Sequence, residues 1–223
     1  MLGALGVLVL VFLFFLLAGE VLEGDTQKFD TRVLTALRRP DDLSTPIGPA
    51  WLQSGALDIT ALGGPTVLGL ATLVISGFLV LQGMARTGAF VFVAATGGWL
   101  LNDLLKQVFQ RARPDIVPHL RDVMSLSFPS GHAMSAAAVY LTLGALTMRV
   151  ADGRVAKWYC MATAMLVTFL VGASRVYLGV HYPTDVLAGW MMGLTWALAC
   201  WVVERRLEQR AGLRLEKQKH SST

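Results

Sequence analysis

The chain has 223 residues, of which 54% are hydrophobic and only 15% are charged. A typical soluble domain has about 25% charged residues, so the composition indicates a membrane protein instead. The net charge of +4 does not indicate nucleic-acid binding, because the basic residues form no stripe interleaved with aromatic side chains. Cys160 and Cys200 both lie inside apolar runs, so we expect neither a disulfide framework nor a cysteine metal site.

The first apolar run covers residues 2–18 and is long enough to cross a bilayer. A cleaved signal peptide is the alternative, but such a peptide starts with basic residues, and no Lys or Arg precedes this run. We therefore expect a retained transmembrane helix, followed by an extracytoplasmic loop over residues 20–65. Within this loop, apolar residues recur at helical spacing, at Phe29, Val33, Leu34 and Leu37. They predict an amphipathic helix at the membrane interface or, equally, an ordinary surface helix.

Five further apolar runs complete a predicted all-α bundle of about six transmembrane helices. They cover residues 66–83, 87–108, 132–150, 158–178 and 184–203. Six spans place both termini on the same side of the membrane. The basic residues of the C-terminal tail then place it in the cytoplasm by the positive-inside rule; they are Arg205, Arg206, Arg210, Arg214, Lys217 and Lys219. We predict one membrane domain, residues 1–203, and a basic cytoplasmic tail, residues 204–223.

About half of the 19 Lys and Arg residues nevertheless fall on the predicted outer side, against this rule. Several of these cations lie near span ends, on the face that also holds His132 and His181: Lys106, Arg111, Arg113, Arg121 and Arg175. A concentration of cations that opposes the rule indicates a function, such as holding an anion.

The segment Pro129-Ser130-Gly131-His132 is a short turn that leads directly into an apolar run. Ser130 is suited to cap the helix, and Gly131 allows close approach of the backbone to a ligand. The first N–H groups of a helix lack internal partners and lie at its partly positive end, so the turn is a candidate anion site. His132 beside it is a candidate proton donor.

Two further clusters lie on the same predicted face. Lys106 and Arg113 are seven residues apart, so they share a helix face if the helix persists as far as Arg113; snorkelling cations are the alternative. His181 and Asp185 are four residues apart around a helix start. The carboxylate can therefore fix the imidazole tautomer and leave the other nitrogen as a nucleophile, although such a pair alone is also a common structural hydrogen bond.

Together these clusters form three motifs: Lys, six residues, Arg-Pro; then Pro-Ser-Gly-His; then Ser-Arg, five residues, His, three residues, Asp. They begin at Lys106, Pro129 and Ser174 and end at Asp185. In this order and spacing they resemble the three-part signature of the type 2 phosphatidic acid phosphatase superfamily, with every position filled.

The resemblance implies a membrane lipid phosphatase that needs neither metal nor cofactor and works at the outer membrane–water boundary. His181 is the implied nucleophile, which forms a phosphohistidine, and Asp185 orients it. His132 is the implied acid for the leaving group and the base for water. The implied phosphate-binding groups are Lys106, Arg113, Ser130, Gly131 and Arg175.

The resemblance also implies a phosphorylated lipid as partner, and the compact chain resembles bacterial members of the family, so we expect a bacterial inner membrane. The charge argument alone predicts that the site faces the periplasm. Phosphatidic acid, phosphatidylglycerol phosphate, undecaprenyl pyrophosphate and lipid A phosphates are candidate substrates. A lipid phosphotransferase, a vanadate-dependent haloperoxidase and a lipid-phosphate transporter or scaffold without turnover are the alternatives. No sequence feature indicates an oligomeric state.

Some polar residues near these motifs are expected to have lesser roles. Asp58, Thr60 and Gly63-Gly64 precede the second span and are candidates to line the entrance of the site. Asp103 is expected to supply polarity at the membrane boundary, with pairing to a cation as the alternative. His119, beside Pro118, is expected to be a surface histidine.

Overall fold

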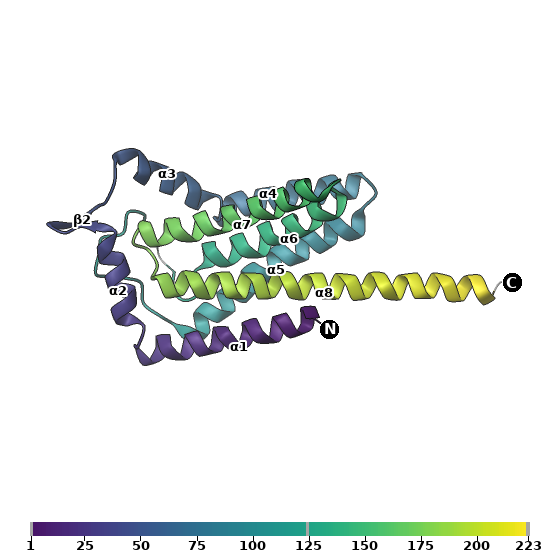
Figure 1. Ribbon diagram of the computed structural model, residues 1–223, viewed down its shortest axis with the longest axis horizontal. Coiled ribbons are helices and arrows are strands. Elements are labelled where there is room, and N and C mark those ends of the chain that lie inside the picture. The colour runs from purple at the N-terminus through teal and green to yellow at the C-terminus, as the bar shows by residue number, and fades with distance from the viewer. Residues whose placement is uncertain (1, 124, 222–223) are drawn as a thin grey trace.

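The computed structural model describes residues 2–123 and 125–221, with side chains over residues 3–206, except 124, and at Gln209. The basic side chains predicted for the tail beyond Arg206 therefore lie outside the described part. Eight helices and one two-stranded antiparallel sheet make up the fold (Figure 1). The elements are α1 (Leu2–Glu23), α2 (Gln27–Ala36), β1 (Arg38–Arg39), β2 (Asp42–Pro46), α3 (Ala50–Ala61), α4 (Pro65–Leu81), α5 (Ala85–Phe109), α6 (Gly131–Val150), α7 (Arg154–Tyr177) and α8 (Pro183–Ser221).

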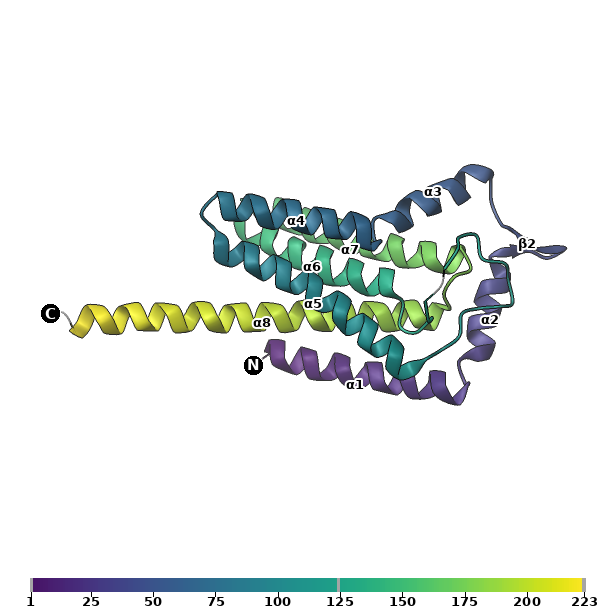
Figure 2. The ribbon, with the colours of Figure 1, turned by 180° about the vertical axis from the view of Figure 1, so that it is seen from behind.

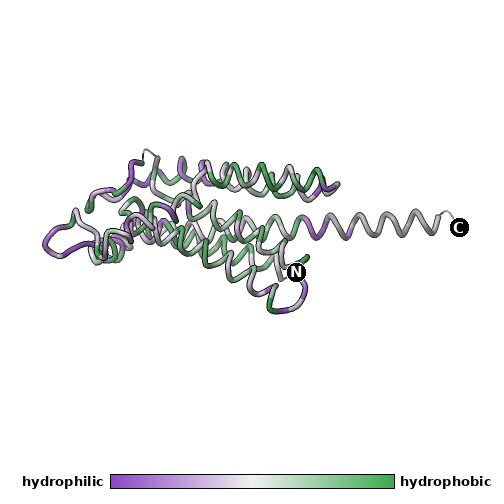
Figure 3. The backbone as a smooth tube through the Cα atoms, turned by 90° about the horizontal axis from the view of Figure 1, so that it is seen from above, coloured by the Kyte–Doolittle hydropathy of each residue, from purple (hydrophilic) through white to green (hydrophobic). Residues whose placement is uncertain are grey.

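The predicted all-α membrane bundle is confirmed. Within the described residues, five helices are long and apolar enough to cross a membrane, and the bent pair α3 and α4 passes the same test together, which gives six spans if the pair counts as one. The start of α1 and the C-terminal part of α8 lie towards the same end, whereas α2 and the β-hairpin lie at the opposite end (Figures 1 and 2). This arrangement is the one that an even number of crossings requires. Hydrophobic residues follow the helices, and hydrophilic residues are frequent at the end with α2 (Figure 3).

The second span differs from its prediction. Residues 50–61 were expected to belong to the polar loop, but they form helix α3, which meets α4 at a bend of 45°. The break lies at Leu62-Gly63-Gly64, directly before Pro65, the first residue of α4. Proline lacks the N–H that would continue the hydrogen bonding of α3, so it starts a new helix here.

Helix α2 confirms the predicted helical spacing and decides which of its faces is buried. Leu34 is fully buried, and it packs against Val186 near the start of α8, whereas Phe29 is 52% exposed. Three of the four stripe residues, Val33, Leu34 and Leu37, therefore contact the protein, and the helix covers the loop between α7 and α8.

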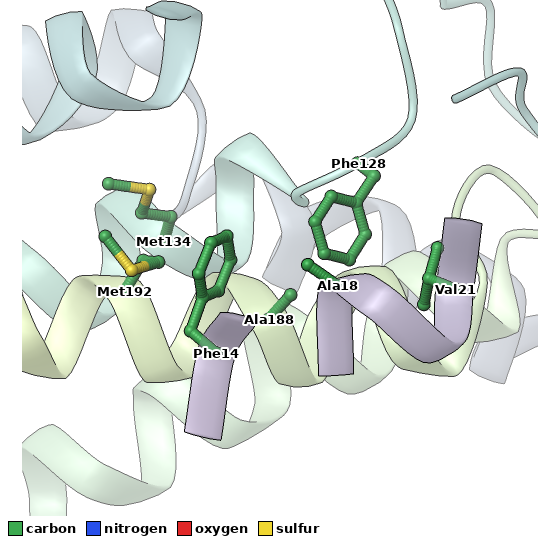
Figure 4. Close-up of a cluster of buried hydrophobic side chains, with 7 residues drawn as sticks. All are labelled: Phe14, Ala18, Val21, Phe128, Met134, Ala188 and Met192. Atoms are coloured by element: carbon green, nitrogen blue, oxygen red, sulfur yellow. The ribbon is translucent and has the colours of Figure 1, made fainter. Parts of the chain in front are cut away.

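Helix α1 packs along α8 and reaches the loop that precedes α6. Phe14 stacks on Phe128 of this loop, with ring centroids 5.8 Å apart. Figure 4 shows both rings in a buried cluster with Val21, Met134 and Met192, together with small residues of α1 and α8. The other face of α1 exposes large apolar side chains, as a lipid-facing helix does. The first span thus packs against one side of the loop that leads into Pro129 to His132 and holds it in place.

Helix α6 lies at the centre of the bundle, packed against α5, α7 and α8. Its contact with α8 depends on glycines. A Cβ at Gly193 would lie 2.5 Å from the Cβ of Ala137 and 2.5 Å from the carbonyl oxygen of Met134. Small residues allow such close approach of helix backbones in membranes.

We expect Gly193→Ala to destabilise the bundle, because the backbone of α6 would have to move away. Overpacking of this kind costs about 1–3 kcal/mol, and each kcal/mol lowers the unfolding midpoint of a chain of this size by about 2–4 °C. Thermal unfolding in detergent measures the change. Gly77→Ala in α4 is the matched control, because no described atom lies within 4 Å of its added Cβ. Equal midpoints for the two variants would contradict the prediction.

Candidate active site

A polar cavity of about 300 Å³ lies at the end of the bundle that α2 covers. Its walls come from the junction of α3 and α4, from α5, α6 and α7, and from the loops that precede α6 and α8. The lining residues are Gly63, Pro65, Trp99, Asn102, Asp103, Lys106, Arg113, Val123, Ser125, Gly131, His132, Ser135, Arg175 and His181. The three sequence motifs therefore meet in one cavity. Of the predicted site residues, only Ser130 and Asp185 lie behind the wall.

His181 presents its two ring nitrogens to different surroundings. Its Nδ1 lies 3.4 Å from Oδ2 of Asp185, and its Nε2 lies 3.1 Å from Nη1 of Arg113, in the wall of the cavity. Pro183 starts α8, which places Asp185 in the first turn, four residues after the histidine. An ionised carboxylate only accepts hydrogen bonds, so it favours the tautomer with the proton on Nδ1. Nε2 then keeps its lone pair, which accepts from Arg113 Nη1 in the wall of the cavity.

Burial lowers the pKa of His181 well below its usual value, and the charges of Arg113, Arg175 and Lys106 lower the pKa further. A neutral ring is thus favoured at neutral pH, which is the form that can act as a nucleophile.

Asp185 is held by neighbours besides His181. Ser127 Oγ donates to its Oδ2 at 2.5 Å, and Arg111 Nη1 donates to its Oδ1 at 2.6 Å.

Lys106 and Arg113 both reach the cavity, but not along one helix. Helix α5 ends at Phe109, and Gln110 has a left-handed conformation with φ of 47°. The helix therefore does not persist as far as Arg113, so the two residues do not share a helix face, and Arg113 enters from the loop that follows. Lys106 Nζ donates to the carbonyl of Leu126.

Arg113 is oriented by the loops on both sides of the cavity. It donates through Nε to the carbonyl of Ser125 and through Nη1 to the carbonyl of Val180, each at 2.6 Å. Burial lowers the pKa of Arg113 to about 10, so this guanidinium remains charged at neutral pH.

Arg175 enters from the last turn of α7 and is 1% exposed. Its Nη1 donates to Thr60 Oγ1 at 3.1 Å, and its Nε has no partner among the described residues. The bent second span thus supplies Thr60, which lies behind a cation of the cavity.

The turn before α6 is built partly as expected. Ser130 occupies the N-cap position of α6, but its side chain makes no capping hydrogen bond, so that expectation is wrong. Its Oγ is buried and unpartnered within the described structure. A Cβ at Gly131 would lie 2.9 Å from Oδ1 of Asn102, so glycine allows α5 and α6 to meet here. His132 has a buried Nε2 with no described hydrogen-bond partner, and its ring lines the cavity.

The residues expected to have lesser roles divide between the cavity and its surroundings. Asp103 lines the cavity and accepts a hydrogen bond from Gln107 at 3.3 Å. Gly63 also lines it, but Asp58 does not. His119 Nε2 lies 2.6 Å from the carbonyl oxygen of Pro114, outside the cavity wall.

Sequence reasoning missed the roles of Ser127 and Arg111 beside Asp185. Ser127 lies three residues before Ser130, in the polar stretch that leads to α6. Arg111 was noted only as one of the cations at the span ends. Its spacing of two from Arg113 is the signal that could have directed attention to it, because the two follow each other in the same loop.

A membrane-spanning helix bundle with two imidazoles and three cations around one polar cavity is suited to phosphoryl chemistry on a membrane substrate. The chain belongs to the PAP2 superfamily, whose family model matches residues 86–209. It is 34% identical to phosphatidylglycerophosphatase B of Bacillus subtilis, over 82% of this chain and 88% of that protein. It is also 33% identical to a lipid A 1-phosphatase of Rhizobium etli, over 53% of this chain and 51% of that protein.

Solved structures agree with these sequence matches. The crystal structure of a transmembrane PAP2 type phosphatidylglycerolphosphate phosphatase from Bacillus subtilis superposes with a TM-score of 0.78 at 29% identity. The match covers 90% of this chain and 96% of that one. The family inferred from the three motifs is confirmed, and the protein is an integral-membrane lipid phosphatase.

Proposed function

We propose that this protein hydrolyses the phosphate monoester or pyrophosphate head group of a membrane lipid through a phosphohistidine at His181. The observation that supports this most strongly is the orientation of the ring, with Nδ1 towards Asp185 and Nε2 towards Arg113 in the cavity wall. Nε2 attacks phosphorus, a bond forms between nitrogen and phosphorus, and the bond to the leaving oxygen breaks. In the second step, water attacks the phosphohistidine, inorganic phosphate leaves and the ring regains its lone pair.

The remaining site residues have separate roles in this proposal. His132 protonates the leaving oxygen in the first step and takes a proton from water in the second. Lys106, Arg113 and Arg175, with the N–H of Gly131, bind the phosphoryl oxygens and stabilise the charge of the transition state. Ser130, whose hydroxyl is buried behind the wall, completes the proposed phosphate-binding set. Three cations supply the positive field, so we propose turnover without a metal or another cofactor.

An apolar groove next to the polar cavity supports a lipid as substrate. It has a volume of about 310 Å³ and lies between α4, α5 and α6. Its walls are Pro65, Leu68, Gly69, Thr72, Leu73, Phe92, Ala95, Thr96, Trp99, Ser135 and Val139. Pro65, Trp99 and Ser135 also line the polar cavity, so the two spaces adjoin. A phosphate head in the cavity places the first part of the lipid tail in this groove.

A screen for phosphate release tests the proposed function and its substrates. The purified protein would be given phosphatidylglycerol phosphate, phosphatidic acid, undecaprenyl pyrophosphate and a lipid A phosphate, with chelator present. We expect release from at least one of these lipids and no loss of rate on chelation. Lipid binding without release would support a binder or transporter, and labelled phosphate appearing on a second lipid would support a phosphotransferase.

Filling the apolar groove should weaken the binding of substrates with a long lipid tail and leave the binding of short, water-soluble substrates unchanged. Gly69→Phe places a ring in the groove, so we expect KM for a long-chain lipid phosphate to rise about 10-fold, whereas a short water-soluble phosphate ester is turned over unchanged. Gly77→Phe is the matched control on the same helix, since Gly77 does not line the groove. Equal effects of Gly69→Phe on both substrates would show that the tail does not occupy this space.

We propose that the cavity faces the periplasm of a bacterial inner membrane and that the basic tail is cytoplasmic. The basic residues of the tail support this orientation by the positive-inside rule. A membrane-impermeant thiol reagent and a cysteine introduced at Ser221 test this orientation. We expect the cysteine to be labelled only after the cells are opened, and labelling in intact cells would reverse the assignment.

A further inference from the structure

Helix α2 carries a buried carboxylate, Asp30, for which the proposed mechanism has no use. Its side chain is 0% exposed, although most of α2 lies at the polar end of the molecule. Arg111 Nη2 donates to its Oδ2 at 2.8 Å, and Thr184 Oγ1 donates to the same oxygen at 2.6 Å. The backbone N–H of Thr184 donates to Oδ1 at 3.1 Å. A charge can be buried in this way only because hydrogen bonds and an ion pair compensate for the loss of water, so the position of Asp30 is fixed, unlike that of a surface carboxylate.

Arg111 connects this carboxylate to the candidate active site. Its second terminal nitrogen, Nη1, donates to Oδ1 of Asp185 at 2.6 Å. The guanidinium carbon lies 4.2 Å from the centroid of the Tyr182 ring, and the side chain is only 12% exposed. One cation therefore bridges two buried carboxylates, and Asp185 in turn lies beside Nδ1 of His181.

The net charge of Asp30, Arg111 and Asp185 beside His181 explains why two carboxylates are present. Asp185 and Arg111 alone would have a net charge of zero next to the histidine. With Asp30, the three groups have a net charge of −1 while the ring of His181 is neutral. Phosphorylation at Nε2 makes the ring cationic, because Nδ1 keeps its proton. The net negative charge on the Nδ1 side of the ring, opposite the cations of the cavity, stabilises this charge, and its effect is strong where water is excluded.

We propose that Asp30 is a positioning residue of the active site, which acts through Arg111. It shares the charge of Arg111, so that Asp185 keeps the negative charge that stabilises the ring of His181 as the phosphoryl group is transferred. This inference rests on the proposed phosphohistidine function. Asp30 itself does not line the cavity and touches no substrate.

The alternative role of Asp30 is purely structural, namely fastening α2 to the start of α8 through Thr184. Asp30→Asn removes the charge and the acceptor for Arg111 Nη2 and Thr184 Oγ1, while its amide oxygen still accepts from the N–H of Thr184. The unfolding midpoint of the variant then measures the structural loss separately from kcat. Outer carboxylates that orient a functional histidine in metal sites are worth about 10–100-fold in activity. We expect kcat to fall by an amount of that order, with KM changed less than about threefold, because Asp30 affects the transition state more than substrate binding.

The closing experiment compares Asp30→Asn with Thr26→Val, both with and without Arg111→Met. Thr26→Val removes a hydrogen bond of 3.4 Å to the same carboxylate and leaves every charge in place, so we expect its kcat to stay within about twofold of wild type. If Asp30 acts through Arg111, Asp30→Asn should cause little further loss of kcat in the Arg111→Met background. The unfolding midpoint of each variant reports the structural contribution.

Two results would overturn the inference. One is an Asp30→Asn variant with a lowered unfolding midpoint and wild-type kcat; the other is an equal fold-loss of kcat with and without Arg111. If Asp30→Asn does not fold, Asp30→Glu and Asp30→Gln replace it, since these two side chains have the same shape and differ in charge and in one hydrogen-bond acceptor. A wild-type protein that releases no phosphate would refute the proposed function itself, whereas an active wild type matched by Asp30→Asn refutes the role of Asp30 alone.

Discussion

His181→Asn is expected to abolish phosphate release from every lipid that the wild-type protein hydrolyses. Asparagine has no lone pair that can attack phosphorus, whereas the Nε2 of His181 lies in the wall of the cavity, 3.1 Å from Arg113 Nη1. Removal of a nucleophile in a comparable catalytic group lowers kcat by about 10⁶-fold, and a residual rate comes from binding and charge stabilisation alone. We therefore expect kcat to fall by at least about 10⁴-fold. Phosphate release measured with the best lipid of the screen checks the rate.

A covalent label distinguishes loss of the nucleophile from a general loss of structure. Wild-type protein quenched during turnover of a ³²P-labelled lipid should carry label that is stable to alkali and lost in acid, as a phosphoramidate bond is, and His181→Asn should carry none. His119→Asn is the matched control, because this histidine contacts the carbonyl of Pro114 outside the cavity. Its rate should stay within about threefold of wild type. A labelled His181→Asn variant would refute the proposed nucleophile.

Hydropathy predicted the membrane spans well because each lipid-facing segment must be apolar over the thickness of the bilayer. It failed for residues 50–61, where Gly55 and Asp58 interrupt the apolar pattern and Pro49 and Gly63-Gly64 indicate turns. The structure makes a helix of this segment and packs it against α7, where Thr60 meets Arg175. Tertiary contact overrides local signals in such a segment.

The motif spacing predicted which residues would gather in the cavity, but it could not predict what holds them. Arg175 and Thr60 are 115 residues apart in the sequence, and Arg111 and Asp185 are 74 residues apart. Periodicity reports only neighbours along one element. For the same reason, Asp30 on α2 could be recognised as part of a charged network only once α2 was placed over the start of α8.

The second large effect is expected for His132→Asn, and it should depend on the leaving group. An alkoxide from a lipid ester leaves poorly unless it is protonated, and general acid–base catalysis of such a transfer contributes about 10²–10⁴-fold. The Nε2 of His132 is buried, lines the cavity and has no protein partner in the described part of the chain, so it is available for this proton. We expect kcat for a lipid phosphate to fall by about that factor in the variant.

An aryl phosphate separates the two steps in which we propose that His132 transfers a proton. A nitrophenolate leaves without protonation, so the first step should survive in His132→Asn while attack of water on the phosphohistidine loses its base. The variant should then release a burst of nitrophenolate close to one per site and accumulate the acid-labile label on His181, which rapid-quench experiments measure. The wild type, which has the base, should show neither under the same conditions. Equal slowing of the lipid phosphate and the aryl phosphate, without accumulated label, would contradict the prediction. The leaving group would then not change the effect of removing His132, so the residue would transfer no proton in either step and would only shape the cavity.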